Sequence, residues 1–103
     1  MPKSKSYHES LIESLKDPTE AAAYLTAALQ DGDRAVFLLA LRNVVEAYSR
    51  DIAALAEKAN LNQEQFSQLF SENGHIEMES LAAVLDALGF ALAIEVKRAS
   101  WLL

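Results

Sequence analysis

Cysteine is absent from the chain, so disulfides and structural zinc sites with thiolate ligands are excluded. The sequence also contains no apolar run of the roughly 18 residues that a membrane-spanning helix requires. Its first residues, MPKSKSYHES, carry charge but are not followed by the apolar core of a signal peptide. We therefore expect a cytoplasmic protein that does not associate with a membrane.

Positive charge is missing from residues 59–96, which contain no lysine or arginine, and the whole chain has a net charge of −6. The carboxylates in the same stretch are Glu64, Glu72, Glu77, Glu79, Asp86 and Glu95. Because neutralisation of phosphate dominates protein–DNA affinity, this stretch is unfavourable for nucleic-acid binding. The cations available to contact phosphate lie outside it, at Lys3, Lys5, Lys16, Arg34, Arg42, Arg50, Lys58, Lys97 and Arg98.

Histidine is scarce, and neither His8 nor His75 has a nucleophile or a metal-binding carboxylate pattern around it. Glu77 and Glu79 fall at the start of a predicted helix, where the helix dipole favours negative charge. A structural role is therefore sufficient to explain them. We expect no enzymatic activity, no metal site and no cofactor.

Apolar residues make up 51% of the 103 residues, which is enough for the core of a single domain. We predict an N-terminal arm over residues 1–16, a domain over residues 17–96 and a C-terminal tail over residues 97–103. Apolar residues between His8 and Leu15 could add one or two helical turns that pack on the domain. The tail ends in apolar residues that either pack on the domain or contact a partner.

Capping signals divide the first part of the domain into two helices. Asp17 is a predicted N-cap with Pro18 at the first helical position, and Gly32 can end this helix in a left-handed conformation. Asp33 caps a second helix, whose apolar positions cover more than half of its circumference, so we expect it to be central. The apolar positions of the two helices are Ala21, Leu25, Ala28, Leu29, Val36, Phe37, Leu38, Leu41, Val44, Val45 and Tyr48.

Residues 51–73 have the apolar spacing of two short helices joined by a turn, which is typical of a helix-turn-helix. The predicted inward positions are Leu55, Ala56, Leu61, Phe66, Leu69 and Phe70. Asn60 occupies the turn position that needs a positive φ, and Asn62 can cap the second helix with Gln65 at the reciprocal position. Asn73 and Gly74 are expected to stop that helix.

A last helix is predicted from Glu77 to Leu88, ending at Gly89. Its predicted inward positions are Met78, Leu81, Ala82, Leu85 and Leu88. After Gly89 the apolar period changes to two, which argues for a β-strand whose apolar face is formed by Phe90, Leu92, Ile94 and Val96. This strand has no second strand in the sequence, so it is either a misread helical extension or pairs with something outside the chain.

Three segments in succession now resemble a known family. DPTEAAAYLTAALQDGDRAVFLLALRNVVEA is followed by LAEKANLNQEQFSQLFSENG and by LAAVLDALGFALAIEV. Together they resemble the addiction-module antidote proteins, a branch of the lambda-repressor-like (Xre) helix-turn-helix superfamily, over roughly residues 10–96. The resemblance implies an all-α, lambda-repressor-like bundle of about five helices, to which the C-terminal strand is added.

The same resemblance implies an antitoxin that binds double-stranded operator DNA, represses its own operon and pairs with a small basic toxin of the RelE/HigB type. The residues expected to contact DNA are Asn62, Gln63, Glu64, Ser67, Gln68 and Ser71. The family usually has a basic residue at Gln63 and another near Gln68, but glutamine can still read adenine. A homodimer is expected, with Phe90, Leu92, Ile94 and Val96 pairing either with a second copy or with the toxin. The alternative is a protein-interaction module that has lost DNA binding.

Overall fold

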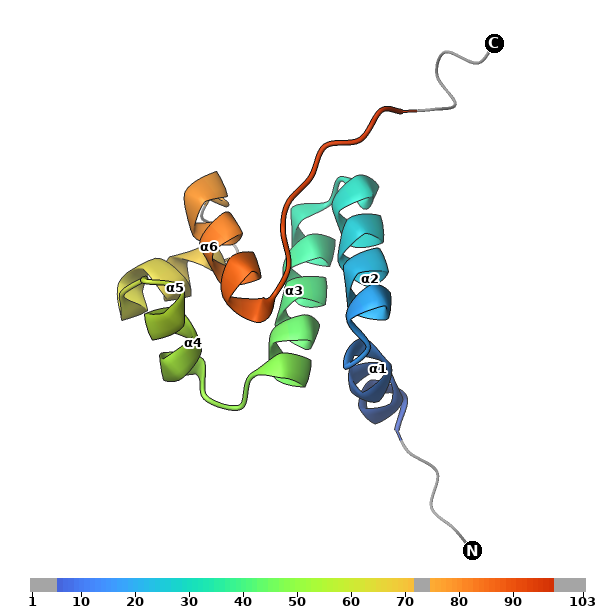
Figure 1. The fold of residues 1–103 in the computed structure, drawn as a ribbon, viewed down its shortest axis with the longest axis horizontal. Helices are drawn as coiled ribbons and strands as arrows, with labels where there is room; N and C mark the ends of the chain where they lie inside the picture. The colour runs from blue at the N-terminus through green and yellow to red at the C-terminus, as the bar shows by residue number, and fades with distance from the viewer. Residues whose placement is uncertain (1–5, 72–74, 98–103) are drawn as a thin grey trace, which may run out of the picture.

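The computed structural model describes residues 6–71 and 75–97. This part of the chain is all-α, with six helices (Figure 1). The helices are α1 (Tyr7–Leu15), α2 (Pro18–Asp31), α3 (Arg34–Tyr48), α4 (Ile52–Lys58), α5 (Gln63–Leu69) and α6 (Met78–Leu88). The predicted phosphate contacts Lys3, Lys5 and Arg98 and the predicted helix stop at Asn73 and Gly74 lie outside the described residues.

The predicted helix ends are confirmed where local chemistry defines them. The Asp17 carboxylate accepts a hydrogen bond from the Thr19 backbone N–H at 2.9 Å and begins α2. Gly32 and Gly89 end α2 and α6 with φ of 85° and 98°, which is a backbone conformation that costs little only for glycine. Helix α5 ends at Leu69, earlier than the predicted stop at Asn73.

Helix α1 lies within the segment that the sequence assigned to the N-terminal arm. Ser6 and Glu9 form a reciprocal capping box at its start, and Leu15 is buried at its end. The His8 side chain lies 3.0 Å from the Glu46 carboxylate of α3. These contacts place α1 against α3, so the bundle has one more helix than the roughly five that were expected.

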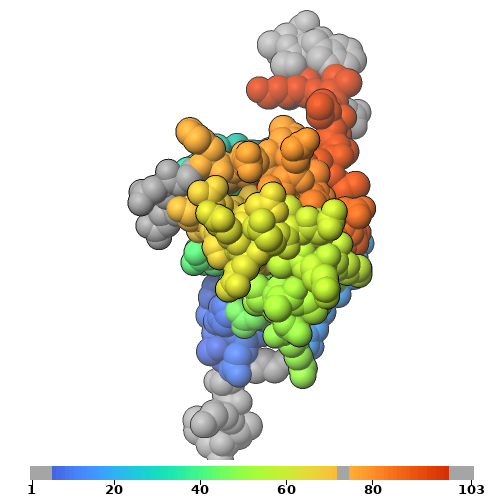
Figure 2. Space-filling view, turned by 90° about the vertical axis from the view of Figure 1, so that its left-hand side faces the viewer, coloured from blue at the N-terminus to red at the C-terminus, as the bar shows by residue number. Residues whose placement is uncertain are grey.

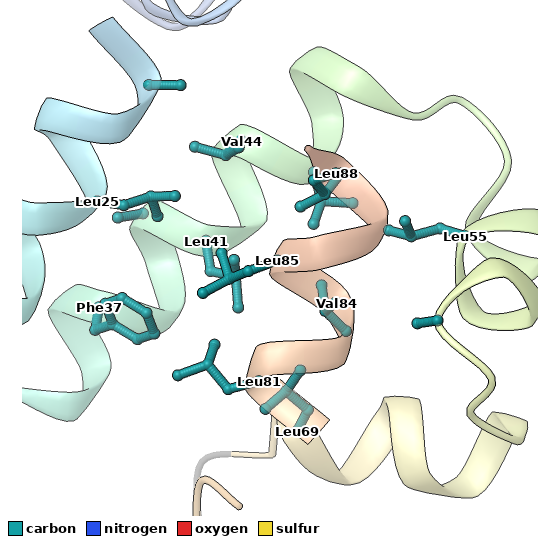
Figure 3. Packing of buried hydrophobic residues seen from close by; sticks show 14 of the residues in the cluster. Leu25, Phe37, Leu41, Val44, Leu55, Leu69, Leu81, Val84, Leu85 and Leu88 are labelled. Carbon is teal, nitrogen blue, oxygen red and sulfur yellow. The ribbon is translucent and has the colours of Figure 1, made fainter. Parts of the chain in front are cut away.

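The helices form two groups that share one core. Helices α1, α2 and α3 pack on one another, and α4, α5 and α6 pack on one another. Leu41 and Val44 of α3 and Leu85 and Leu88 of α6 belong to a single buried cluster between the groups (Figure 3). Helix α6 therefore lies between α3 on one side and the pair α4 and α5 on the other (Figure 1).

Some predicted core positions are wrong. Met78 is 72% exposed and Ala82 is also exposed, whereas Val84 of the same helix is fully buried. Leu29 and Val36 are exposed because they point away from the inner faces of α2 and α3. The remaining predicted positions in these helices are buried or partly buried.

The predicted β-strand is not confirmed, because residues 90–97 form an extended segment without strand pairing in the described chain (Figure 1). A strand requires a neighbour with which to exchange backbone hydrogen bonds. Phe90 is anchored at the start of the segment, where its N–H donates to the Leu85 carbonyl at 2.8 Å and its ring meets the Tyr48 ring edge-on at 5.6 Å. Beyond Phe90 the segment extends away from the end of α6 and projects beyond the helices (Figure 1).

Candidate nucleic-acid interface

Helices α4 and α5 and the turn between them form one side of the molecule (Figure 2). Asp51 caps α4 by accepting from the Ala54 N–H, and Lys58 lies in the last turn, where the helix dipole favours a cation. Asn60 has a φ of 62° in the turn, as its position in the sequence predicted. The left-handed residue reverses the chain within a few residues and sets the start of α5.

Reciprocal hydrogen bonds fix the first turn of α5. The Asn62 side chain accepts from the Gln65 N–H at 2.7 Å, and the Gln65 side chain accepts from the Asn62 N–H at 2.9 Å. This capping box was predicted from the sequence. It uses Gln65 and the Asn62 oxygen structurally, so these groups are engaged within the chain.

The two faces of α5 differ in the way its apolar spacing predicts. Phe66 and Leu69 are buried, and their rings and methyl groups belong to the common core. The exposed residues at the start of α5 and along its outer face are Asn62, Gln63, Glu64, Ser67 and Gln68. Ser71 follows the helix and is half-buried. Of the predicted contact residues, Gln63, Glu64, Ser67 and Gln68 are therefore exposed on α5, Asn62 is exposed at its N-cap, and Ser71 lies beyond its end.

A shallow concavity of about 910 Å³ lies between the outer faces of α4 and α5. Asn62, Gln63 and Ser67 line it from the α5 side, whereas Glu64 and Gln68 lie outside it. Asp51 and Glu57 line it from the α4 side, and no lysine or arginine belongs to its lining. The concavity therefore has acidic side chains on its α4 side and amides on its α5 side, and its lining also includes the apolar residues Ile52, Leu61 and Phe66.

Arg42, one of the cations that the sequence offered for phosphate contacts, is brought by the fold to the end of α5. Its guanidinium donates to the Phe70 carbonyl at 3.2 Å and lies 5.8 Å from the centre of the Phe70 ring. The Phe70 ring in turn lies 5.2 Å from that of Phe66. Arg42 thus places positive charge beside the C-terminal end of α5. Because the contact spans 28 positions in the sequence, no local pattern could have predicted it.

Of the other cations, two lie near the candidate interface and one lies on the opposite group of helices. Arg50 and Lys58 are exposed at the two ends of α4, close to the candidate interface. Lys16 lies at the end of α1, 4.0 Å from Glu13. Glu64 lies in the first turn of α5. Its carboxylate therefore faces the positive end of the helix dipole, which would otherwise attract a phosphate.

The described residues contain no cluster of histidine and carboxylate side chains suited to a metal ion. Within the same residues, no helix is both long and apolar enough to cross a membrane. The predicted pairing residues Leu92, Ile94 and Val96 are exposed on the C-terminal segment, separate from the α4 and α5 surface.

Comparison with known proteins gives a match at the level of the family. The search of curated proteins and the search of solved structures found no match. A family model described as "probable addiction module antidote protein" matches residues 6–96, which include every helix of the bundle. The chain therefore belongs to this family of antidotes, the antitoxin components of toxin–antitoxin modules.

Proposed function

We propose that α4, the turn and α5 form a DNA-binding helix-turn-helix and that the chain is an antitoxin that represses its own operon. The observation that carries the proposal is the division of α5 into a buried apolar face and an exposed face of amides and hydroxyls. In a helix-turn-helix the second helix enters the major groove and contacts base edges near its N-terminus. Gln63 has that position on α5.

The chemistry of the exposed face suits base recognition better than phosphate binding. A glutamine side-chain amide matches adenine, because its N–H donates to N7 while its oxygen accepts from the N6 amino group. Gln63 and Gln68 are the two exposed glutamines on this face that hold no capping role. We expect them to read A·T pairs, with Asn62, Ser67 and Ser71 adding shorter polar contacts and Glu64 able to accept from cytosine.

Phosphate contacts must then come from cations beside α5. We expect these contacts from Arg50 and Lys58, which lie at the ends of α4, and from Arg42, which lies beside Phe70. Few cations mean few released counterions, so the affinity should be low and its dependence on salt shallow.

The antidote role implies a toxin as partner. We propose a small basic toxin of the RelE/HigB type, because the chain carries a net charge of −6 and residues 59–96 contain no lysine or arginine. Opposite charge steers such a pair together and favours the correct partner. The same charge favours a second candidate function, a toxin-binding module that has lost DNA binding.

A mobility-shift assay with the chain's own upstream DNA separates the two functions. At low salt we expect a shift that survives competition by unrelated DNA. The combined Gln63→Ala and Gln68→Ala variant should lose this preference, by about 1–3 kcal/mol for each bidentate contact removed. Thr19→Ala is the control, since Thr19 is an exposed polar residue of α2 outside the proposed interface.

Unchanged binding in the double variant would show that α5 does not read the DNA. No shift at low salt, combined with binding to a basic protein encoded by the neighbouring gene, would favour the toxin-binding module alone. The assay should therefore be run with and without that neighbour.

A further inference from the structure

The extended segment Phe90–Val96 has a self-complementary apolar pattern. Its apolar side chains are placed symmetrically about Ala93, at one and three positions on either side: Phe90, Leu92, Ile94 and Val96. Successive side chains in an extended chain alternate between two faces, so these four share one face. The other face carries Ala91, Ala93 and Glu95.

The burial of this apolar face falls along the segment. Phe90 packs partly against the common core, and Leu92 is 39% exposed. Val96 is 70% exposed, and Ile94 is fully exposed. Among the backbone hydrogen bonds of the described residues, none involves residues 91–96. The described part of the chain therefore leaves Ile94, Val96 and the backbone groups of residues 91–96 uncovered, and the segment projects beyond the helices (Figure 2).

A groove of about 370 Å³ lies between this segment and α2. Leu25 and Leu29 of α2 and Phe37 of α3 line one side, and Phe90 and Leu92 line the other. Leu29 is 50% exposed at the mouth of this groove. Ala91, Ala93 and Glu95 also line the groove, which therefore follows the segment as far as Glu95, whereas Ile94 and Val96 do not line it.

We propose that Phe90–Val96 pairs antiparallel with the same segment of a second copy, across a two-fold axis at Ala93. In this register Ile94 lies opposite Leu92 of the second copy, and Val96 lies opposite its Phe90. The uncovered half of each segment is therefore brought to the anchored half of the other, beside the groove along α2. Each copy covers what the other leaves exposed, which is the self-complementarity that a two-fold interface requires.

Other registers fit the segment less well. If the register shifted by one residue, the apolar side chains of the two segments would lie on opposite faces of the two-stranded ladder. A two-fold axis at Glu95 would set the two Glu95 carboxylates directly opposite each other, which is destabilising. The axis at Ala93 places Glu95 opposite Ala91 and pairs every apolar side chain with another. It also adds no like-charge contact between two copies that each carry a net charge of −6.

The chain has no cysteine, so a single introduced thiol reports the register directly. Directly opposite residues in an antiparallel pair have Cα atoms about 4.5–5.5 Å apart, which is within the range of a disulfide. Under mild oxidation with copper phenanthroline, Ala93→Cys should form a covalent dimer. Ala91→Cys is the matched control, because two Ala91 residues would be separated by roughly four residues of strand, about 13 Å.

A mixture of Ala91→Cys with Glu95→Cys should cross-link, because these positions lie opposite each other in the same register. A covalent dimer with Ala91→Cys alone, or none with Ala93→Cys, would overturn the proposed pairing.

Light scattering on the full chain gives an independent test, for which we choose a substitution that should not unfold the monomer. Ile94→Glu changes a fully exposed side chain, so its circular dichroism and melting curve should show a folded bundle. The dissociation constant of the dimer should rise by at least about tenfold, since two buried apolar side chains per dimer are replaced by charges. Leu39→Glu makes the same change at an exposed position of α3 and should leave the dimer unchanged.

A wild-type chain that remains monomeric at high micromolar concentration would refute the proposal and leave the segment for a strand of another protein, such as the toxin. Dissociation by Leu39→Glu but not by Ile94→Glu would place the interface on α3 instead. The pairing does not require DNA binding, so a chain that dimerises through Ala93 but does not shift DNA would retain this inference and lose only the proposed function.

Discussion

Phe66 is the large aromatic side chain that α5 buries in the common core, and its truncation tests the packing of this helix. It is 7% exposed, and its ring lies 5.2 Å from the Phe70 ring. Phe66 also borders both the concavity between α4 and α5 and an apolar groove that reaches Val45 of α3. Truncation to alanine would leave a void at the point where these three helices meet.

We expect Phe66→Ala to lower the free energy of unfolding by about 3–5 kcal/mol. A domain of this size has a total stability of roughly 5–15 kcal/mol, so the loss is a large fraction of it. Each kcal/mol corresponds to about 4 °C or more in melting temperature for a domain near 100 residues, which gives a decrease of at least roughly 12 °C.

Thermal and urea unfolding followed by circular dichroism measures this loss. Parent and variant must be compared at equal protein concentration, because association contributes to apparent stability. Ser67→Ala, at the next and exposed position, should change stability by less than about 0.5 kcal/mol. A Phe66→Ala variant that melts within about 2 °C of the parent would refute the assignment of Phe66 to the core and the packing of α5 derived from it.

Three further outcomes are expected. Asn60→Ala should destabilise the chain by about 1–2 kcal/mol in urea unfolding, because the φ of 62° is costly for alanine, whereas Asn60→Gly should stay close to the parent. Tyr24→Phe should cost about 1–3 kcal/mol in the same assay, since the buried Asn43 amide donates to the Tyr24 hydroxyl at 2.9 Å and would lose its acceptor. Burial and the Asp17 carboxylate raise the pKa of Tyr48 above its usual 10.0. The stabilisation from this group is therefore complete below pH 10 and is lost as the pH rises through the folded-state pKa, so stability should fall there more steeply in the parent than in Tyr48→Phe.

The parts of the fold set by local chemistry could be predicted from the sequence. Asp17, Asn62 and Gly89 act through hydrogen bonds or backbone angles within a few residues, so each helix end they define could be recognised before any packing was known. The left-handed conformation of Asn60 was predictable for the same reason.

The phase of α6 was harder to predict, because apolar residues occur on nearly all sides of it. Met78 and Val84 are both compatible with a helical stripe, and only the position of α3 and the α4 and α5 pair decides that Val84 is buried. The contact between Arg42 and Phe70 depends on the same tertiary arrangement. The alternating pattern of residues 90–96 could not decide whether they form a strand, because a strand needs a neighbouring strand and the described part of the chain contains none.

Helix α6 joins the surface proposed to read DNA to the segment proposed to pair two copies. It packs on α4 and α5 along its length, and Gly89 directly connects its end to Phe90. Its 11 residues span about 16 Å, and a short packed helix of this length does not bend appreciably. In a pair of copies related by a two-fold axis at Ala93, a rigid α6 would therefore fix the distance and the angle between the two α5 helices. The spacing of the half-sites in a palindromic operator would then depend on the length of α6, on the backbone angles of Gly89 and on the way the segment lies along α2.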